Sequence, residues 1–189
     1  MTIETPIKPD YWASSLPSRS IGNLVDGLAA IEVEDHGFTA VMGLARHARN
    51  RNRVFFVGNG GSSAIASHMA IDWQNTGRFA AMCFNDASAL TCIGNDYGIR
   101  FVFDFQVMRH ILPGDLLFVI SSSGKSPNVV EVAKNAARVT DVVTLSGFDP
   151  DNALRKLGKV NFYVPSKSYG TVEVAHLAIL HALLDELVK

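Results

Sequence analysis

The sequence has little cysteine, no excess of either charge and no long apolar run. Its 189 residues include two cysteines, Cys83 and Cys92, too few for a disulfide framework. Lys and Arg number 17 against 18 Asp and Glu, a balance that argues against a large nucleic-acid surface. No apolar run reaches the roughly 18 residues of a membrane span, and residues 1–20 lack the basic and apolar segments of a secretory signal. We therefore expect a cytoplasmic protein with neither a nucleic-acid nor a membrane partner.

What is present is typical of one folded domain. Hydrophobic residues make up 48% of the chain and charged residues 19%, and the length allows a substantial buried core. Three short, nearly continuous apolar runs cover residues 54–57, 116–120 and 142–145. Such runs suit central strands of a parallel sheet that is buried on both faces. Two weaker strand candidates cover residues 80–84 and 160–164.

Helical patterns alternate with these runs. They cover residues 62–74, 99–110, 128–138 and 170–188. Strands that alternate with helices predict a three-layer α/β/α sandwich with a five-stranded parallel sheet. Residues 1–50 differ, because two further helices, over 21–33 and 38–49, precede the first strand. We expect an N-terminal helical extension over residues 1–50 that takes part in oligomerisation, followed by the sheet domain over 51–189, in a single folding unit.

A glycine-rich loop follows the first predicted strand. Its sequence is Gly-Asn-Gly-Gly-Ser-Ser over residues 58–63, directly before a predicted helix. Glycines let the backbone approach a ligand closely, and the free N–H groups of a helix start can bind an anion. The spacing matches neither a dinucleotide fingerprint nor a Walker loop. A tight strand–helix turn without a ligand is the alternative interpretation.

A serine-rich loop follows the predicted strand over residues 116–120. It reads Ser-Ser-Ser-Gly-Lys-Ser-Pro-Asn over residues 121–128. The serines are a dense set of hydroxyl donors, and the helix that begins near Pro127 directs its positive end toward them. Both loops stand at the carboxyl ends of strands, where ligands of open α/β sheets bind. Together they predict a phosphate site, although a serine-rich loop alone can also be an ordinary solvated turn.

Three segments resemble the sugar isomerase (SIS) domain: VGNGGSSA, ISSSGKSPNVVEVAKNA and VVTLSGFD. Three others, TGRF, Asp86-x-Ser88 and IGNDYG, are similar in order and spacing to segments of the phosphoheptose isomerases. The resemblance implies the SIS fold and a homotetramer with active sites between subunits. It implies that the phosphate is held by Ser62, Ser121, Ser123 and Ser126, with Ser122 where the family usually has Thr. The other expected substrate-binding residues are Asn59, which would lie close to the sugar, Gly60, Gly61, Asp86, Asn95, Asp96 and Glu173.

Two pairs of residues on predicted helices are candidates for a metal site. His68 and Asp72 are four residues apart and share one helix face, whereas Glu173 and His181 are separated by a rise of about 12 Å. In phosphoheptose isomerases a His and a Glu four apart, with a Gln and a His eight apart, surround a zinc ion. The resemblance therefore implies one zinc ion per site, bound by His68, Asp72, Glu173 and His181. Here Asp72 replaces the Glu and Glu173 replaces the Gln, and this set of imidazoles and carboxylates suits zinc.

The activity that the resemblance implies is ketose–aldose isomerisation of a phosphosugar through an enediol. The expected reaction converts sedoheptulose 7-phosphate to glycero-manno-heptose 7-phosphate for lipopolysaccharide or capsule synthesis, with Asp72 and His181 as acid and base. Two alternatives stay open. One is a non-catalytic SIS module that senses a phosphosugar or acts as a scaffold for a protein partner. The other is an isomerase for a different ketose phosphate in surface-polysaccharide synthesis.

Overall fold

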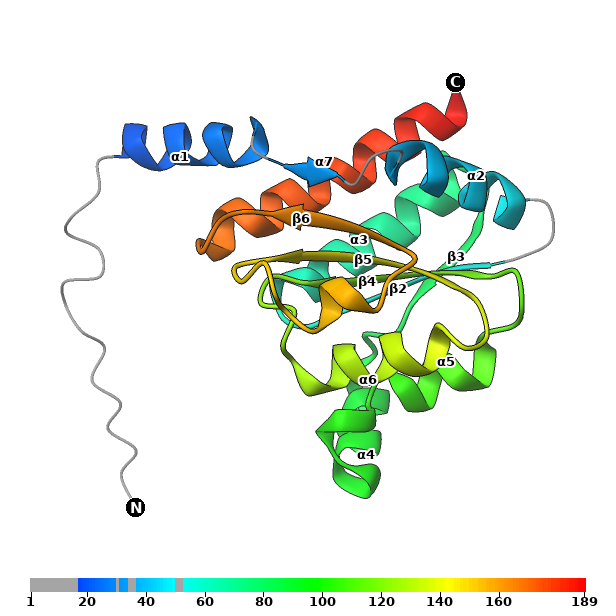
Figure 1. Ribbon diagram of the computed structural model, residues 1–189. Coiled ribbons are helices and arrows are strands. Elements are labelled where there is room, and N and C mark those ends of the chain that lie inside the picture. Colours follow the sequence, from blue (N-terminus) through cyan, green and yellow to red (C-terminus); the bar gives the residue numbers. More distant parts are fainter. Residues whose placement is uncertain (1–16, 30, 34–36, 50–52) are drawn as a thin grey trace, which may run out of the picture.

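The computed structural model describes residues 17–29, 31–33, 37–49 and 53–189, and it shows a sheet between two layers of helices (Figure 1). The strands are β1 (Glu32–Val33), β2 (Arg53–Gly58), β3 (Ala80–Cys83), β4 (Leu116–Ser121), β5 (Asp141–Gly147) and β6 (Val160–Val164). The α-helices are α1 (Pro17–Ala29), α2 (Gly37–Arg49), α3 (Gly61–Asn75), α4 (Ala87–Tyr97), α5 (Asp104–His110), α6 (Pro127–Ala136) and α7 (Tyr169–Val188). Two short 3-10 helices are η2 (Ile99–Phe101) and η3 (Leu154–Lys156). No described helix is both long and apolar enough to cross a membrane.

The sheet has the strand order β1-β6-β5-β4-β2-β3. Strands β2 to β6 pair in parallel, which confirms the predicted five-stranded parallel sheet. Strand β1 adds a short antiparallel edge, with Glu32 opposite Tyr163 and Val33 opposite Phe162. The predicted helix over residues 21–33 is therefore wrong at its carboxyl end, where the alternating Ile-Glu-Val pattern forms an edge strand instead.

Both faces of the sheet are buried, as the continuous apolar runs predict. Along β2, Val54 and Phe56 face the core under α2, α3 and α7, whereas Phe55 and Val57 face the core over α4, α5 and α6. Figure 1 shows these two groups of helices on opposite sides of the sheet. Trp73 of α3 lies with its ring edge-on to Phe56 at 5.6 Å between centroids. This packing fixes α3 on the sheet.

Two other boundaries differ from the sequence-based expectation. Residues 87–97 form helix α4, which the sequence analysis leaves unassigned, and Asp86 caps it by accepting a hydrogen bond from the Ala89 N–H at 2.9 Å. The predicted helix over 99–110 is divided into η2 and α5. The proposed boundary between an N-terminal extension and the sheet domain, at residues 50 and 51, lies outside the described residues.

The register of the sheet places the two candidate loops together. Gly58 at the end of β2 pairs with Ile120, one residue before the end of β4. The loops that follow, residues 59–60 and 122–126, therefore leave adjacent strands at the same edge. This is the carboxyl edge of the parallel sheet, where helices α3 and α6 begin.

Candidate active site

The glycine loop between β2 and α3 is shaped by close packing. A Cβ added to Gly58 would lie 2.7 Å from the Ser62 Cβ, so only glycine lets the first turn of α3 approach the strand end this closely. Gly60 has a φ of 53°, in the left-handed region that glycine adopts without strain. No side chain of the described residues caps the amino end of α3, and the Ser63 and Ala64 N–H groups donate to the Gly60 carbonyl. The two N–H groups before them, of Gly61 and Ser62, are the ones that an anion could bind.

The serine loop between β4 and α6 is held by hydrogen bonds that its own hydroxyl oxygens accept from backbone N–H groups. Ser121 Oγ accepts from the Gly124 N–H at 3.2 Å, and Ser123 Oγ accepts from the Lys125 N–H at 3.3 Å. Gly124 has a φ of 61°, and a Cβ there would overlap the Asn152 side chain. Ser122 Oγ is buried and has no hydrogen-bond partner among the described residues. A buried hydroxyl in that state is costly unless a ligand completes it.

A pair of side-chain amides ties the two loops together. Asn59 Nδ2 donates to Asn128 Oδ1 at 2.8 Å, and Asn128 Nδ2 donates to Asn59 Oδ1 at 2.9 Å. Asn128 is buried at the start of α6. Asn59, which we expect close to the sugar, therefore also sets the spacing of the loops. Asn128 is absent from the predicted site residues, and the signal for it is its position directly after Pro127 at a helix start.

The loops and α7 enclose a pocket of about 260 Å³. Its lining unites nine of the predicted substrate-binding residues: Asn59, Gly60, Gly61, Ser62, Ser121, Ser122, Ser123, Ser126 and Glu173. The tenth lining residue is Tyr169, which the sequence analysis does not single out. Tyr169 precedes the predicted start of the last helix by one residue, so an exact helix boundary would have placed it beside Glu173 on one face. The pocket combines helix amino ends with hydroxyl groups and suits a phosphate group.

Helices α3 and α7 form a seam that leads away from this pocket. At one end, the Glu173 carboxylate lies over Gly61, where any Cβ would overlap it. Further along, His68 Nε2 lies 3.2 Å from His181 Nε2. The contact advances by seven residues on α3 and eight on α7, which means that the two helices run in the same direction.

The far end of the seam holds a compact group of metal-ligand types. Asp72 Oδ2 lies 3.3 Å from His68 Nε2 and 3.9 Å from His181 Nδ1. One ligand atom from each of His68, Asp72 and His181 lies within 4.8 Å of the others. Two imidazole nitrogens and a carboxylate oxygen fit a divalent ion such as zinc. Glu173 lies outside this group, in the wall of the phosphate-type pocket, and its assignment as a metal ligand stays a prediction.

Comparisons with known proteins show the family of the chain. A sequence model of the SIS domain matches residues 29–147. The phosphoheptose isomerase of Helicobacter hepaticus is 38% identical over 152 residues, which cover 75% of this chain and 76% of that protein. The chain belongs to the phosphoheptose isomerase family of SIS domain proteins. This finding confirms the resemblance seen in the loops.

Solved structures of this phosphoheptose isomerase family share the fold. The phosphoheptose isomerase GmhA from Neisseria gonorrhoeae superposes with a TM-score of 0.78 at 31% identity, covering 92% of this chain and 99% of that chain. A phosphoheptose isomerase from Francisella tularensis superposes with a TM-score of 0.76 at 25% identity, covering 90% of this chain and 93% of that chain. The chain therefore has the SIS fold of this family along nearly its whole length.

Three residues that the family resemblance suggests for substrate binding lie apart from the pocket lining. Asp86 caps α4, and Asn95 Nδ2 donates to Asp96 Oδ1 at 2.9 Å on the exposed side of that helix. Asp96 also raises the pKa of the Cys92 thiol, chiefly through the hydrogen bond between the two side chains. None of the three is among the described residues that line the pocket, and their role in substrate binding stays a prediction.

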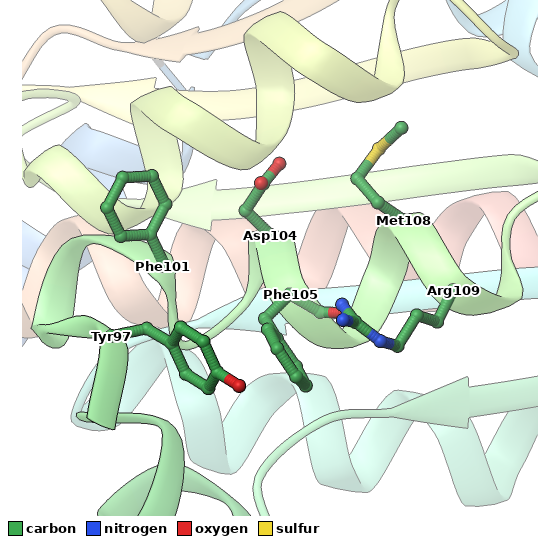
Figure 2. A pocket seen from close by; sticks show the side chains of 6 residues that line it. All are labelled: Tyr97, Phe101, Asp104, Phe105, Met108 and Arg109. Atoms are coloured by element: carbon green, nitrogen blue, oxygen red, sulfur yellow. The ribbon is translucent and has the colours of Figure 1, made fainter. Parts of the chain in front are cut away.

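A second hollow, of about 290 Å³, lies on the helices that cover the other face of the sheet. Figure 2 shows the Arg109 guanidinium reaching toward the ring of Phe105, beside Tyr97. The guanidinium carbon of Arg109 lies 3.4 Å from the centroid of the Phe105 ring. The ring centroids of Tyr97 and Phe105 are 4.7 Å apart. Half of the described lining residues of this hollow are aromatic, unlike the hydroxyl-rich lining of the phosphate-type pocket. The pocket between the glycine and serine loops, called the serine pocket below, has the serine hydroxyl groups that suit a phosphate, and the second hollow lacks them among its described lining residues.

Proposed function

We propose that the protein interconverts the ketose and aldose forms of a phosphosugar, with sedoheptulose 7-phosphate as the ketose. The observation that carries the proposal is the seam between α3 and α7, which connects a serine pocket to the His68–Asp72–His181 group. The names of the relatives support the substrate class, because they are phosphoheptose isomerases. The pathway, a homotetramer with shared active sites and a cytoplasmic location remain parts of this proposal.

In this proposal the phosphate binds first to the two loops. The amino end of α3 would direct N–H groups at it, and Ser122 Oγ would gain the partner that it lacks among the described residues. From Ser62 to His68 the axis of α3 rises by about 9 Å. A phosphosugar anchored at Ser62 would thus extend its carbonyl end along the seam toward the histidines.

Glu173 would face the sugar close to its phosphate end, because its carboxylate lies over Gly61 at the start of α3. It is the only carboxylate among the described residues that line the pocket, and it would accept hydrogen bonds from sugar hydroxyls. Its charge would also disfavour a second anionic group at that point of the ligand. Both effects favour a neutral polyhydroxyl chain that carries a single terminal phosphate.

The proton transfer itself would use Asp72 and His181. One of them removes the C1 proton of the ketose, the electron pair forms the C1–C2 double bond of the enediol, and the carbonyl oxygen takes up a proton. Return of a proton to C2 and loss of the proton on the C1 oxygen then give the aldose. When a zinc ion is bound by His68, Asp72 and His181, it supplies polarisation of the substrate oxygens.

The test is an isomerisation assay with sedoheptulose 7-phosphate. We expect Asp72→Asn and His181→Gln each to lower kcat/KM by at least about 100-fold, the usual range for a lost acid or base. His47→Gln, at an exposed position of α2, is the matched histidine control and should keep full activity. Activity that survives both site substitutions would refute the assignment. Binding of the phosphosugar without conversion by the unaltered protein would favour the non-catalytic alternative.

A further inference from the structure

Tyr169 gives the serine pocket an aromatic wall. It is the first residue of α7 and the only aromatic one among the described residues that line the pocket. Ser168 caps the helix by accepting a hydrogen bond from the Thr171 N–H, which anchors the backbone next to Tyr169. The tyrosine is 63% exposed. A large aromatic surface is therefore presented to solvent at the wall of a polar pocket.

Phe148 supports the ring of Tyr169 from behind. The two ring centroids are 4.8 Å apart with an interplanar angle of 76°, a favourable edge-to-face geometry. Phe148 itself has a φ of 60°, a left-handed conformation that is strained for a bulky residue. Its N–H donates to the Ser166 carbonyl at 3.0 Å, and its own carbonyl accepts from the Tyr163 hydroxyl at 3.2 Å. Contacts on both sides thus hold the support of Tyr169 in place.

The remaining lining of the pocket is suited to polar groups only. Hydroxyls, an amide, glycine backbone and one carboxylate can bind phosphate and sugar hydroxyls. A sugar phosphate also carries C–H groups along its carbon chain, and their removal from water is favourable where an apolar surface receives them. A tyrosine ring offers such a surface together with a polar tip. Inorganic phosphate has no carbon chain and gains nothing from the ring.

We propose that Tyr169 is a substrate-binding and specificity-determining residue whose ring packs against the carbon chain of a bound phosphosugar. The inference rests on the proposed function only in that a phosphosugar occupies this pocket, and it does not depend on catalysis. It predicts that Tyr169 adds affinity for a sugar phosphate and none for inorganic phosphate. The ratio of the two dissociation constants therefore isolates its contribution.

The experiment measures the affinities of the full-length protein for sedoheptulose 7-phosphate and inorganic phosphate by calorimetry. Tyr169→Ala should weaken the binding of sedoheptulose 7-phosphate about tenfold, the factor that corresponds to about 50 Å² of apolar contact. The same substitution should leave the binding of inorganic phosphate unchanged. Tyr169→Phe keeps the ring and should retain the preference. Phe148→Leu removes the supporting ring and should reduce the preference for sedoheptulose 7-phosphate over inorganic phosphate. Tyr97→Ala, at a tyrosine of similar exposure (56%) on the other face of the sheet, is the matched control.

The outcomes separate this inference from the proposed function. A tenfold loss confined to sedoheptulose 7-phosphate supports it, whether or not the unaltered protein converts that sugar. Equal weakening of both ligands by Tyr169→Ala overturns it, because the tyrosine would then act on the phosphate loops. An unaltered protein that binds sedoheptulose 7-phosphate no more tightly than inorganic phosphate also overturns it. Isomerase activity with an unchanged affinity ratio in Tyr169→Ala would refute the inference and leave the proposed function intact.

Discussion

The buried histidine of α7 makes the stability of the fold depend on pH. His176 is fully buried, and its Nε2 lies 3.2 Å from the Ser146 carbonyl at the end of β5. A carbonyl only accepts, so Nε2 carries the hydrogen and Nδ1 is bare, with no partner among the described residues. Protonation of Nδ1 would bury a charged donor without an acceptor. Burial therefore lowers the pKa of His176 to about 4, although the Ser146 carbonyl acts in the opposite direction.

The size of the effect follows from the two protonation states. In the unfolded chain the imidazole has its ordinary pKa of 6.5, whereas in the folded protein its pKa is about 4. Between these values the unfolded state binds more protons than the folded state, so the free energy of unfolding falls as the pH falls. The free energy of unfolding falls by about 2 kcal/mol by about pH 5, and by about 3 kcal/mol in all below about pH 4. Above about pH 7 the imidazole is neutral in both states, so no stability is lost through His176.

Urea unfolding at about pH 7.5 and about pH 5, with a chelator present, measures this loss. His176→Gln can still donate to the Ser146 carbonyl but does not titrate. The variant is expected to have a lower free energy of unfolding than the unaltered protein at both pH values. From about pH 7.5 to about pH 5, however, its free energy of unfolding should fall by about 2 kcal/mol less than that of the unaltered protein. The exposed His47→Gln variant should follow the unaltered protein. Equal losses in the unaltered protein and in His176→Gln would refute the reasoning, because every other titrating group is common to both.

Three further predictions concern the site. Gly61→Ala should displace the Glu173 carboxylate that its Cβ would overlap, and steady-state kinetics should show KM raised at least about fivefold with the fold intact by circular dichroism. Gly124→Ala combines a left-handed φ with overlap of Asn152, so urea unfolding should show a loss of about 2 kcal/mol or more. Zinc should raise the melting temperature of the unaltered protein and have less effect on Asp72→Asn, because an ion that binds only the folded state stabilises it; equal shifts would exclude Asp72 as a ligand.

The sequence predicts the sheet better than the helices. Residues 54–57 and 116–120 have no polar residue, and each falls inside a strand buried on both faces. Residues 87–97 lack a clear apolar face, and Ile93 is their only buried residue. Packing against the layer around α5 stabilises this helix more than its own pattern does. The Asp86 cap was the available local signal.

The sequence predicts those parts of the site that lie next to a strand end, but not the parts that depend on contacts between distant helices. The serine pocket follows from the rule that parallel strands end at one edge, because both loops come directly after such strands. The approach of His68 to His181 joins residues 113 positions apart. It depends on α3 and α7 packing in parallel at one register, which spacing within either helix does not determine. Tyr169 becomes part of the pocket only through the same packing.

The two replacements in the expected metal-ligand set have different structural consequences. Asp72 is shorter than the Glu that it replaces, yet its carboxylate reaches both histidines, at 3.3 and 3.9 Å. The shorter side chain therefore does not open the group. Glu173 instead lies at the amino end of α3, where the helix dipole favours a negative charge, and Gly61 provides the space. That position lies two helical turns from the histidines, so the added charge would act first on a ligand bound in the pocket.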